Sequence, residues 1–279
     1  MNMARSTYYY QQKNRDRVVK KEKQDADIKE MIDEIHMEFP YYGYRMLHQE
    51  LERRGHVINT KKIRRIQRKF GLFPVRLRKF VSTTDFKHAH RVYPNLLKEK
   101  SELTDLDEAW VADITYVRIL TGFVYVAIIM DLCSRRVVGW AVSKNIDRKL
   151  TLGALEMAIE NRSPDVGCIH HSDRGVQYAC NDYIDLLQEW GFEISMSRKG
   201  NPYDNAAMES FMKTLKYNEI YLKNYDTFVD VLNHLPEFIE EVYNKKRLHS
   251  SLGYLTPEEF EWQFKKQTAG SADHLNLEI

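Results

Sequence analysis

Glu209 and Lys216 stand seven positions apart within GNPYDNAAMESFMKTLKYNE, residues 200–219, a stretch that predicts a turn followed by a helix. At about 100° per residue, side chains seven apart on a helix lie within roughly 20° of each other and about 10 Å apart along the axis. The carboxylate and the ammonium group therefore share one stripe of the helix but are too far apart for a salt bridge. This spacing leaves both charges available for other partners.

Two further acids, Asp113 and Asp173, occupy positions where a structural acid is unexpected. Asp113 interrupts an apolar, β-branched run, and Asp173 begins Asp-Arg-Gly, in which Gly175 allows a tight turn that exposes the carboxylate. Three carboxylates supply the hard oxygen ligands that suit Mg²⁺ or Mn²⁺. Two such ions about 4 Å apart activate an attacking hydroxyl and stabilise the leaving oxygen of a phosphodiester. Because the chain contains 40 acidic residues, spacing alone does not select this set, and Asp131 is the strongest alternative acid.

The elements that must position these acids alternate in a recognisable order. Three β-rich runs, 109–120, 122–134 and 135–143, are separated by short breaks and predict an antiparallel meander. Before the helix that carries Glu209 we predict a helix at 147–162, a strand at 166–173, a helix at 181–191 and a strand at 192–197. The order βββαβαβα is that of the ribonuclease H-like α/β fold, in which strands one and four are neighbours. Asp113, Asp173 and Glu209 are therefore expected to converge as catalytic residues and metal ligands.

The first third of the chain is basic and helical. Residues 1–100 contain 24 Lys+Arg and 12 Asp+Glu, which leaves 18 of the total of 42 and 28 of the total of 40 for the remainder. Apolar spacing predicts helices at 25–39, 44–55 and 59–72, and the last two, joined by a short turn, have the helix-turn-helix pattern. An ordinary solvated charged face is the alternative interpretation. The cations expected to bind DNA phosphates on the third helix are Lys61, Lys62, Arg64, Arg65 and Arg68, with Lys69 beside them.

Composition limits the class of protein. No apolar run reaches the roughly 18 residues of a membrane span, and the N-terminus has no signal-peptide pattern. The three cysteines lack metal-binding spacing, which favours the cytoplasm over a disulfide-forming compartment. We predict a helical DNA-binding region (1–75), a basic linker (76–107), a ribonuclease H-like catalytic core (108–220), a C-terminal helical extension (221–267) and a disordered tail (268–279).

Three motifs resemble those of a known family. WVADITYV (110–117), HHSDRGVQY (170–178) and SRKGNPYDNAAMESFMKTLK (197–216) closely resemble the catalytic motifs of bacterial insertion-sequence transposases, members of the DDE transposase and retroviral-integrase superfamily. The subgroup is the IS-three family, whose transposase is read from two overlapping frames. The resemblance extends to YYGYRMLHQEL (41–51) and YNKKRLHSSLGYLTPEEF (243–260), so it covers most of the chain. Asp173 and Glu209 have the family's 35 intervening residues, and Lys216 stands where the family has Lys or Arg.

The resemblance implies a second-frame catalytic subunit that nicks the ends of its element and joins a 3′-hydroxyl to another DNA strand. The expected chemistry is direct transesterification with two Mg²⁺ ions (Mn²⁺ as a substitute) per site. Expected partners are double-stranded DNA, further copies of the chain, and an upstream first-frame product or a frameshift fusion with it. Lys216 would hold the DNA end, and Asn201 and Asn205, otherwise helix caps, would contact DNA beside the site. A non-catalytic DNA-binding regulator from a decayed element and a ribonuclease H-type nuclease are the alternative functions.

Overall fold

The structure, a computed structural model, describes residues 5–75, 91–98, 100, 103–198 and 205–275. Two units can be separated along the chain, Met1–Arg78 and Lys79–Ile279. Asn201 and the first half of the predicted linker lie outside the described residues.

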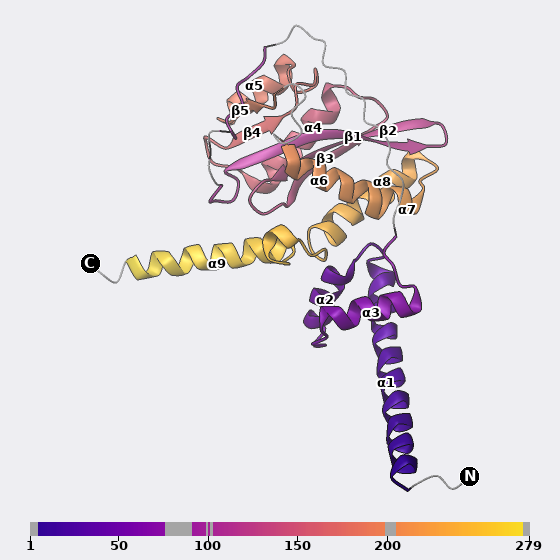
Figure 1. Cartoon of the computed structure of the whole chain (residues 1–279). Helices are drawn as coiled ribbons and strands as arrows, with labels where there is room; N and C mark the ends of the chain where they lie inside the picture. The colour runs from indigo at the N-terminus through magenta and orange to yellow at the C-terminus, as the bar shows by residue number, and fades with distance from the viewer. Residues whose placement is uncertain (1–4, 76–90, 99, 101–102, 199–204, 276–279) are drawn as a thin grey trace. The chain divides into compact units, whose positions relative to one another are not determined.

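A mixed five-stranded sheet forms the centre of the second unit (Figure 1). Its strands are β1 (Ala109–Ile119), β2 (Gly122–Asp131), β3 (Val137–Ser143), β4 (Ile169–Ser172) and β5 (Glu193–Met196). The order across the sheet is β3-β2-β1-β4-β5. β2 pairs antiparallel with β1 and β3, whereas β4 pairs parallel with β1 and β5. The predicted meander and the predicted neighbourhood of strands one and four are both confirmed.

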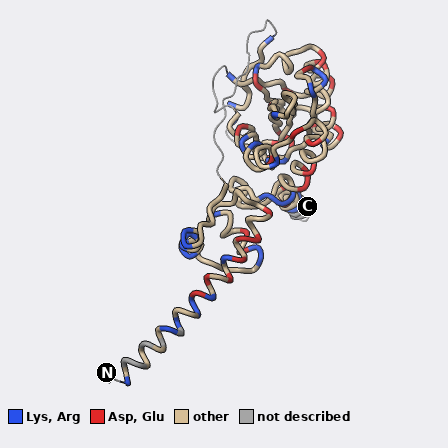
Figure 2. Tube along the Cα trace, turned by 90° about the vertical axis from the view of Figure 1, so that its right-hand side faces the viewer, with Lys and Arg blue, Asp and Glu red and all other residues tan. Residues whose placement is uncertain are grey.

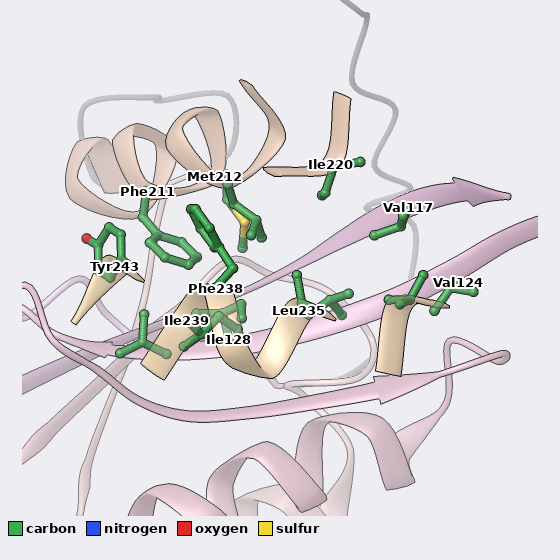
Figure 3. Close-up of a cluster of buried hydrophobic side chains, with 14 of the residues drawn as sticks. Val117, Val124, Ile128, Phe211, Met212, Ile220, Leu235, Phe238, Ile239 and Tyr243 are labelled. Atoms are coloured by element: carbon green, nitrogen blue, oxygen red, sulfur yellow. The ribbon is translucent and has the colours of Figure 1, made fainter. Parts of the chain in front are cut away.

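Helices cover both faces of this sheet. They are α4 (Arg148–Arg162), α5 (Asn181–Glu189), α6 (Ala206–Leu215) and α8 (Phe228–Glu237). Apolar residues of α4 and α5 pack in one buried cluster, which contains Trp110 and Tyr183. Residues of α6 and α8 pack in a second cluster, which contains Phe211 and Leu235 (Figure 3). The second cluster fixes α6, and with it Glu209, against β1.

The segment predicted as a separate C-terminal extension belongs largely to the same core. Its elements are π-helices at Lys216–Ile220 and Phe238–Tyr243, α7 (Tyr221–Lys223), a 3-10 turn at Ser250–Leu252 and α9 (Pro257–Leu275). Tyr225, Val231 and Ile239 are buried in the cluster that α6 forms with the sheet, so this segment completes the core. None of the helices in the described part of the chain is both long and apolar enough for a bilayer span.

Two predicted irregular segments carry more structure than we expected. α9 runs to Leu275, through most of the predicted disordered tail, since a polar composition removes a packing face without preventing a helical backbone. Part of the predicted linker lies along β5. There the Leu96 N–H donates to Ser195 Oγ at 2.9 Å, and the Met196 N–H donates to the Pro94 carbonyl at 3.2 Å.

The first unit contains α1 (Arg5–Glu38), α2 (Tyr44–Arg53) and α3 (Thr60–Phe70). The Asn59 side chain accepts a hydrogen bond from the Lys61 N–H at 2.8 Å, and Gly71 ends α3 in the left-handed conformation, as the sequence predicts. The helices bury a small apolar core made of Ile28, Ile32, Ile35, Leu47, Leu51, Ile63 and Ile66.

α1 is much longer than the helix predicted at 25–39. It begins at Arg5 and runs as one continuous helix (Figure 2). The side chains described before Asp25 are all exposed. Apolar residues at helical spacing indicate only the part of a helix that packs against other elements. The sequence pattern therefore does not predict the exposed turns of α1 before Asp25. The cations along these turns include Arg15, Arg17, Lys20, Lys21 and Lys23.

Candidate active site

Asp113 lies on β1, at the point where this strand loses its neighbour. β4 pairs with β1 only from Ala109 to Val111, so beyond Val111 that edge of β1 has no strand partner among the described residues. Asp113 is half-buried, and its Oδ1 accepts a hydrogen bond from the Ile114 N–H at 2.8 Å. The Asp113 carboxylate therefore lies where β1 has no neighbouring strand on the β4 side among the described residues.

Asp173 directly follows β4 and lies beside Asp113. The parallel register pairs Val111 with His171, so the same register two residues further brings Asp113 next to Asp173. Asp173 Oδ1 accepts a hydrogen bond from the Gly175 N–H at 2.8 Å. A Cβ at Gly175 would lie 2.8 Å from the same carboxylate oxygen, so a larger residue there would displace the Asp173 carboxylate.

Glu209 projects from the first turn of α6. Its neighbours Met208, Phe211 and Met212 are buried against the sheet, whereas Glu209 itself is exposed. Asn205 occupies the N-cap position, but its side chain makes no capping hydrogen bond, so the predicted capping role is wrong. Its Oδ1 is buried and has no hydrogen-bond partner among the residues that the structure describes.

The charges of these residues act on one another. Burial of the Asp113 carboxyl, with the charges of Asp173 and Glu209 adding to it, raises its pKa to about 7, against the opposing effects of the Ile114 N–H and Lys216. The structure thus brings the three predicted acids into one electrostatic neighbourhood. Among the described residues, however, no three His, Cys, Asp or Glu side chains are gathered closely enough to form a metal-binding group.

Lys216 begins the π-helix that follows α6. Its Nζ lies 5.0 Å from the centroid of the Tyr116 ring, a cation–π distance. Burial lowers the pKa of the Lys216 ammonium group, and the charge of Asp113 acts in the opposite direction. The predicted stripe of Glu209 and Lys216 is therefore formed, and its basic end lies near Asp113.

Family comparisons agree with this arrangement. An integrase core domain model matches residues 106–202, a second integrase core domain model matches 190–257, and an HTH-like domain model matches 22–80. The insertion element IS600 uncharacterized 31 kDa protein of Shigella sonnei is 38% identical over 228 residues, which cover 82% of this chain and 84% of that protein. The chain belongs to the insertion-sequence transposases.

Two named transposases are similar over most of their length. The transposase for insertion sequence element IS904 of Lactococcus lactis is 36% identical over 220 residues, 79% of this chain and 87% of that protein. Transposase InsF for insertion sequence IS3A of Escherichia coli is also 36% identical over 220 residues, 79% of this chain and 76% of that protein. The predicted IS-three family membership is confirmed. The catalytic core domain of BIV integrase aligns with 58% of this chain and 99% of its own, with 18% identity and a TM-score of 0.45.

Asp131, the alternative acid, has a different environment in the transposase. It is fully buried, and its Oδ2 accepts hydrogen bonds from the Ser134 N–H and hydroxyl, both at 2.7 Å. The Ser134 hydroxyl oxygen also lies 2.9 Å from Glu261 Oε1, and Arg162 binds Glu261 and Asp107. Asp131 therefore belongs to a buried polar network that attaches α9 to the sheet.

The two histidines before Asp173 also have internal partners. His170 Nε2 lies 2.9 Å from the Tyr183 hydroxyl, and burial lowers the His170 pKa to about 3. His171 Nδ1 lies 2.8 Å from Ser195 Oγ. Both side chains join β4 to elements packed on it.

The predicted DNA-binding cations of α3 fall into two groups. Lys61, Arg64 and Arg68 are exposed and Lys62 is half-buried, with the Arg64 guanidinium 5.0 Å from the Tyr44 ring centroid. Arg65 differs, because its guanidinium binds both oxygens of the buried Asp25. Arg65 is therefore part of the domain's own packing and not of the exposed row.

Sequence reasoning missed the ring under Lys216. The sequence predicts only that Tyr116 lies in a strand, because aromatic side chains are common in strands. A lysine directly after α6 and an aromatic residue three positions after Asp113 do not signal contact until α6 is packed on β1.

Proposed function

We propose that this chain is a metal-dependent transposase that cleaves the ends of an insertion sequence and transfers a 3′-hydroxyl to another DNA strand. The observation that supports it best is that Asp173 and Glu209, from two other elements of an integrase-type core, both act electrostatically on Asp113. A neighbouring negative charge raises the pKa of a carboxylate, and a cation bound between the carboxylates would lower that pKa again.

The donor set fits hard divalent cations. All three side chains offer carboxylate oxygens, and the pKa of Asp113 is raised chiefly by burial, with the negative charges of Asp173 and Glu209 acting in the same direction. Asp113, Asp173 and Glu209 would hold Mg²⁺, or Mn²⁺ in its place, as two ions. Bound there, the ions would supply Lewis-acid stabilisation of the phosphodiester oxygens and a more acidic nucleophile. Lys216 would bind a phosphate of the DNA end, and the Gly175 N–H would hold Asp173 in place.

The proposal includes the DNA-binding region. One side of α3 carries four cations, Lys61, Lys62, Arg64 and Arg68. These cations would neutralise DNA phosphates while the helix lies in the major groove. Pairing of two element ends would require more than one copy of the chain, and the first-frame product or a fusion with it would add end recognition. Such a protein would act in the cytoplasm, at the nucleoid.

The test uses the purified chain, with and without the first-frame product, on DNA that carries the terminal sequences of its element. Strand cleavage and joining in Mg²⁺ are expected, and Asp173→Asn should abolish both while DNA affinity stays unchanged. Asp165→Asn, an exposed aspartate before β4, is the matched control and should retain activity. Full activity of Asp173→Asn would refute the assignment of the acids. Cleavage of RNA–DNA hybrids without joining would favour the nuclease, and binding without cleavage would favour a regulator.

A further inference from the structure

Aromatic rings gather beside Lys216 at the open edge of β1. The Tyr116 ring, 5.0 Å from Lys216 Nζ, meets the ring of Phe123 edge to face, with centroids 5.4 Å apart and planes at 86°. Tyr217 and Tyr221, from the turns after α6, form a second edge-to-face pair with centroids 5.5 Å apart. We call these four residues, Tyr116, Phe123, Tyr217 and Tyr221, the aromatic shelf.

The π-helix places Tyr221 on the stripe that carries Lys216. The Tyr221 N–H bonds to the Lys216 carbonyl, five residues earlier, so these two residues lie on one face. In a continuous α-helix, Ile220 would be nearer that position, but Ile220 is buried in the cluster with Val117 and Val124 (Figure 3). The π turn therefore buries Ile220 and continues the stripe Glu209–Lys216 with an aromatic residue. π turns of this kind are frequent at functional sites.

Tyr221 packs against the cluster that α6 forms with the sheet, whereas the other three rings belong to neither buried cluster. Phe123 is 49% exposed, and the three tyrosines are half-buried. Burial raises the pKa of Tyr221, and Tyr217 and Tyr116 lie near enough to raise it further through their charge. The two ring pairs therefore adjoin. A group of half-exposed rings next to a lysine is costly to leave in water and is the composition of a stacking surface for nucleobases.

We propose that the aromatic shelf stacks an unpaired nucleobase of the DNA strand whose phosphate Lys216 binds. This inference rests on the proposed function, because it is that function which brings DNA to Asp113 and its partners. A base frayed from the duplex at the reacting end would present its face to Tyr116 or Tyr221, while its backbone runs past Lys216 toward the acids. Stacking is tolerant of sequence, since every base has a π face. The shelf would therefore hold the reacting strand in place without reading its sequence.

The first measurement is the affinity for a duplex with a three-nucleotide unpaired tail, compared with the blunt duplex of the same sequence, in Ca²⁺ to prevent turnover. The full-length protein should prefer the tailed duplex by about tenfold, and Tyr116→Leu or Tyr221→Leu should remove that preference. Tyr116→Phe keeps the ring and should keep the preference. Trp262→Leu is the matched control, because Lys266 Nζ lies 4.4 Å from the Trp262 ring on α9, outside the shelf.

The second measurement is photo-crosslinking with 5-iodouracil in the tail, mapped by mass spectrometry. Crosslinks to Tyr116 or Tyr221 are expected. Separate 3′-tailed and 5′-tailed duplexes distinguish which strand reaches the shelf, and a nicked duplex without a free end serves for target DNA. A tail preference that survives in both leucine variants, or crosslinks that fall only outside the shelf, would overturn the proposal. If the wild type joins DNA strands but shows no tail preference, only the shelf is wrong; if it neither cleaves nor joins, the proposed function fails first.

Discussion

The Arg65 guanidinium binds both oxygens of the buried Asp25 carboxylate, with NH1 2.8 Å from Oδ2 and NH2 2.5 Å from Oδ1. Lys69 Nζ lies 3.2 Å from the same carboxylate. These contacts join α1 to α3 and hold the pKa of Asp25 at about 2, chiefly through the Arg65 hydrogen bonds. The orientation of the basic helix thus depends on an acid forty residues earlier in the chain.

Replacement of Asp25 by alanine should loosen α1 from α3. The change removes the buried acceptor of two cations, so we expect a loss of about 1–3 kcal/mol in the local stability of the first unit. Hydrogen exchange of the α3 amides measures this directly and should accelerate. Asp27→Ala, at an exposed position on the same helix, is the control and should leave exchange unchanged. Equal protection in Asp25→Ala would show that the apolar core alone fixes α3.

Salt dependence of DNA binding should separate the exposed cations of α3 from Arg65. Each cation that neutralises one phosphate contributes roughly 0.9 to the slope of log Kobs against log salt concentration. Lys61→Ala and Arg68→Ala should each lower the slope by about 1, because both side chains are exposed. Arg65→Ala should leave the slope nearly unchanged once the fraction of folded protein is accounted for, because its guanidinium already binds Asp25. A full unit lost in Arg65→Ala alone would contradict this division.

Much of the site could be predicted because its position follows from chain order. Once three β-rich runs and a βαβ sequence are recognised, β1 and β4 must be neighbours, and Asp113 and Asp173 share a register. Glu209 follows from the helix after β5. Short patterns in the sequence carry this information, since strand alternation and helix spacing are local.

Contacts between distant elements could not be predicted in this way. The pair Asp25–Arg65 joins two helices whose facing sides depend on packing, and the early turns of α1 have no packing partner to mark them. The contact of Lys216 with Tyr116 depends on the packing of α6 against β1, and no residue pattern in the sequence indicates the π turn that follows α6. Helix and strand propensities describe each element by itself, whereas these two contacts form only where two elements pack together.

A methyl group at Gly175 should disturb catalysis more than folding. The Cβ of Gly175→Ala would lie 2.8 Å from Asp173 Oδ1, so the carboxylate must move. Misplacement of a catalytic group on this scale costs roughly tenfold to a hundredfold in rate. Strand-joining rate and melting temperature, measured together, test this. The control is Gly153→Ala on α4, where the new Cβ would make an ordinary 3.6 Å contact with Ala141 and should leave activity intact. Wild-type rates in Gly175→Ala would mean that the Asp173 carboxylate needs no fixed position.

Loss of Arg162 should destabilise the second unit strongly. Its side chain is 10% exposed and binds Asp107 at 2.7 Å and Glu261 at 2.9 Å. Arg162→Met removes the cation that both acids share and leaves Glu261 only its longer contact with Arg136, at 3.3 Å. We expect a loss of about 3 kcal/mol or more in the free energy of unfolding. Urea unfolding followed by tryptophan fluorescence is suitable, because Trp110 Nε1 donates to Asp107.

Arg148→Met is the matched control on the same helix. Arg148 pairs with Asp182 at 2.6 Å, but the two side chains are 62% and 48% exposed, so the expected cost is below about 1 kcal/mol. Similar losses in the two variants would show that burial does not strengthen the Arg162 network.

Acid should weaken the second unit through His170. Burial lowers its pKa from 6.5 to about 3, so between these values the unfolded chain binds a proton that the folded chain does not. The stability that neutral His170 contributes is complete above about pH 6.5 and is lost as the pH falls toward 3. Burial raises the pKa of Asp131 to about 6, which gives the opposite slope over part of this range, so the informative quantity is a difference between variants.

The difference in unfolding free energy between the wild type and His170→Gln should change by about 1 kcal/mol per pH unit below pH 6.5, in favour of the variant. Urea midpoints at pH 7.5, 6.5, 5.5 and 5.0 measure it. Asn233→Gln, at an exposed position on α8 and without an ionisable group, should show a constant difference. A constant difference for His170→Gln as well would mean that the folded protein admits the proton, and that the hydrogen bond to Tyr183 does not keep the ring neutral.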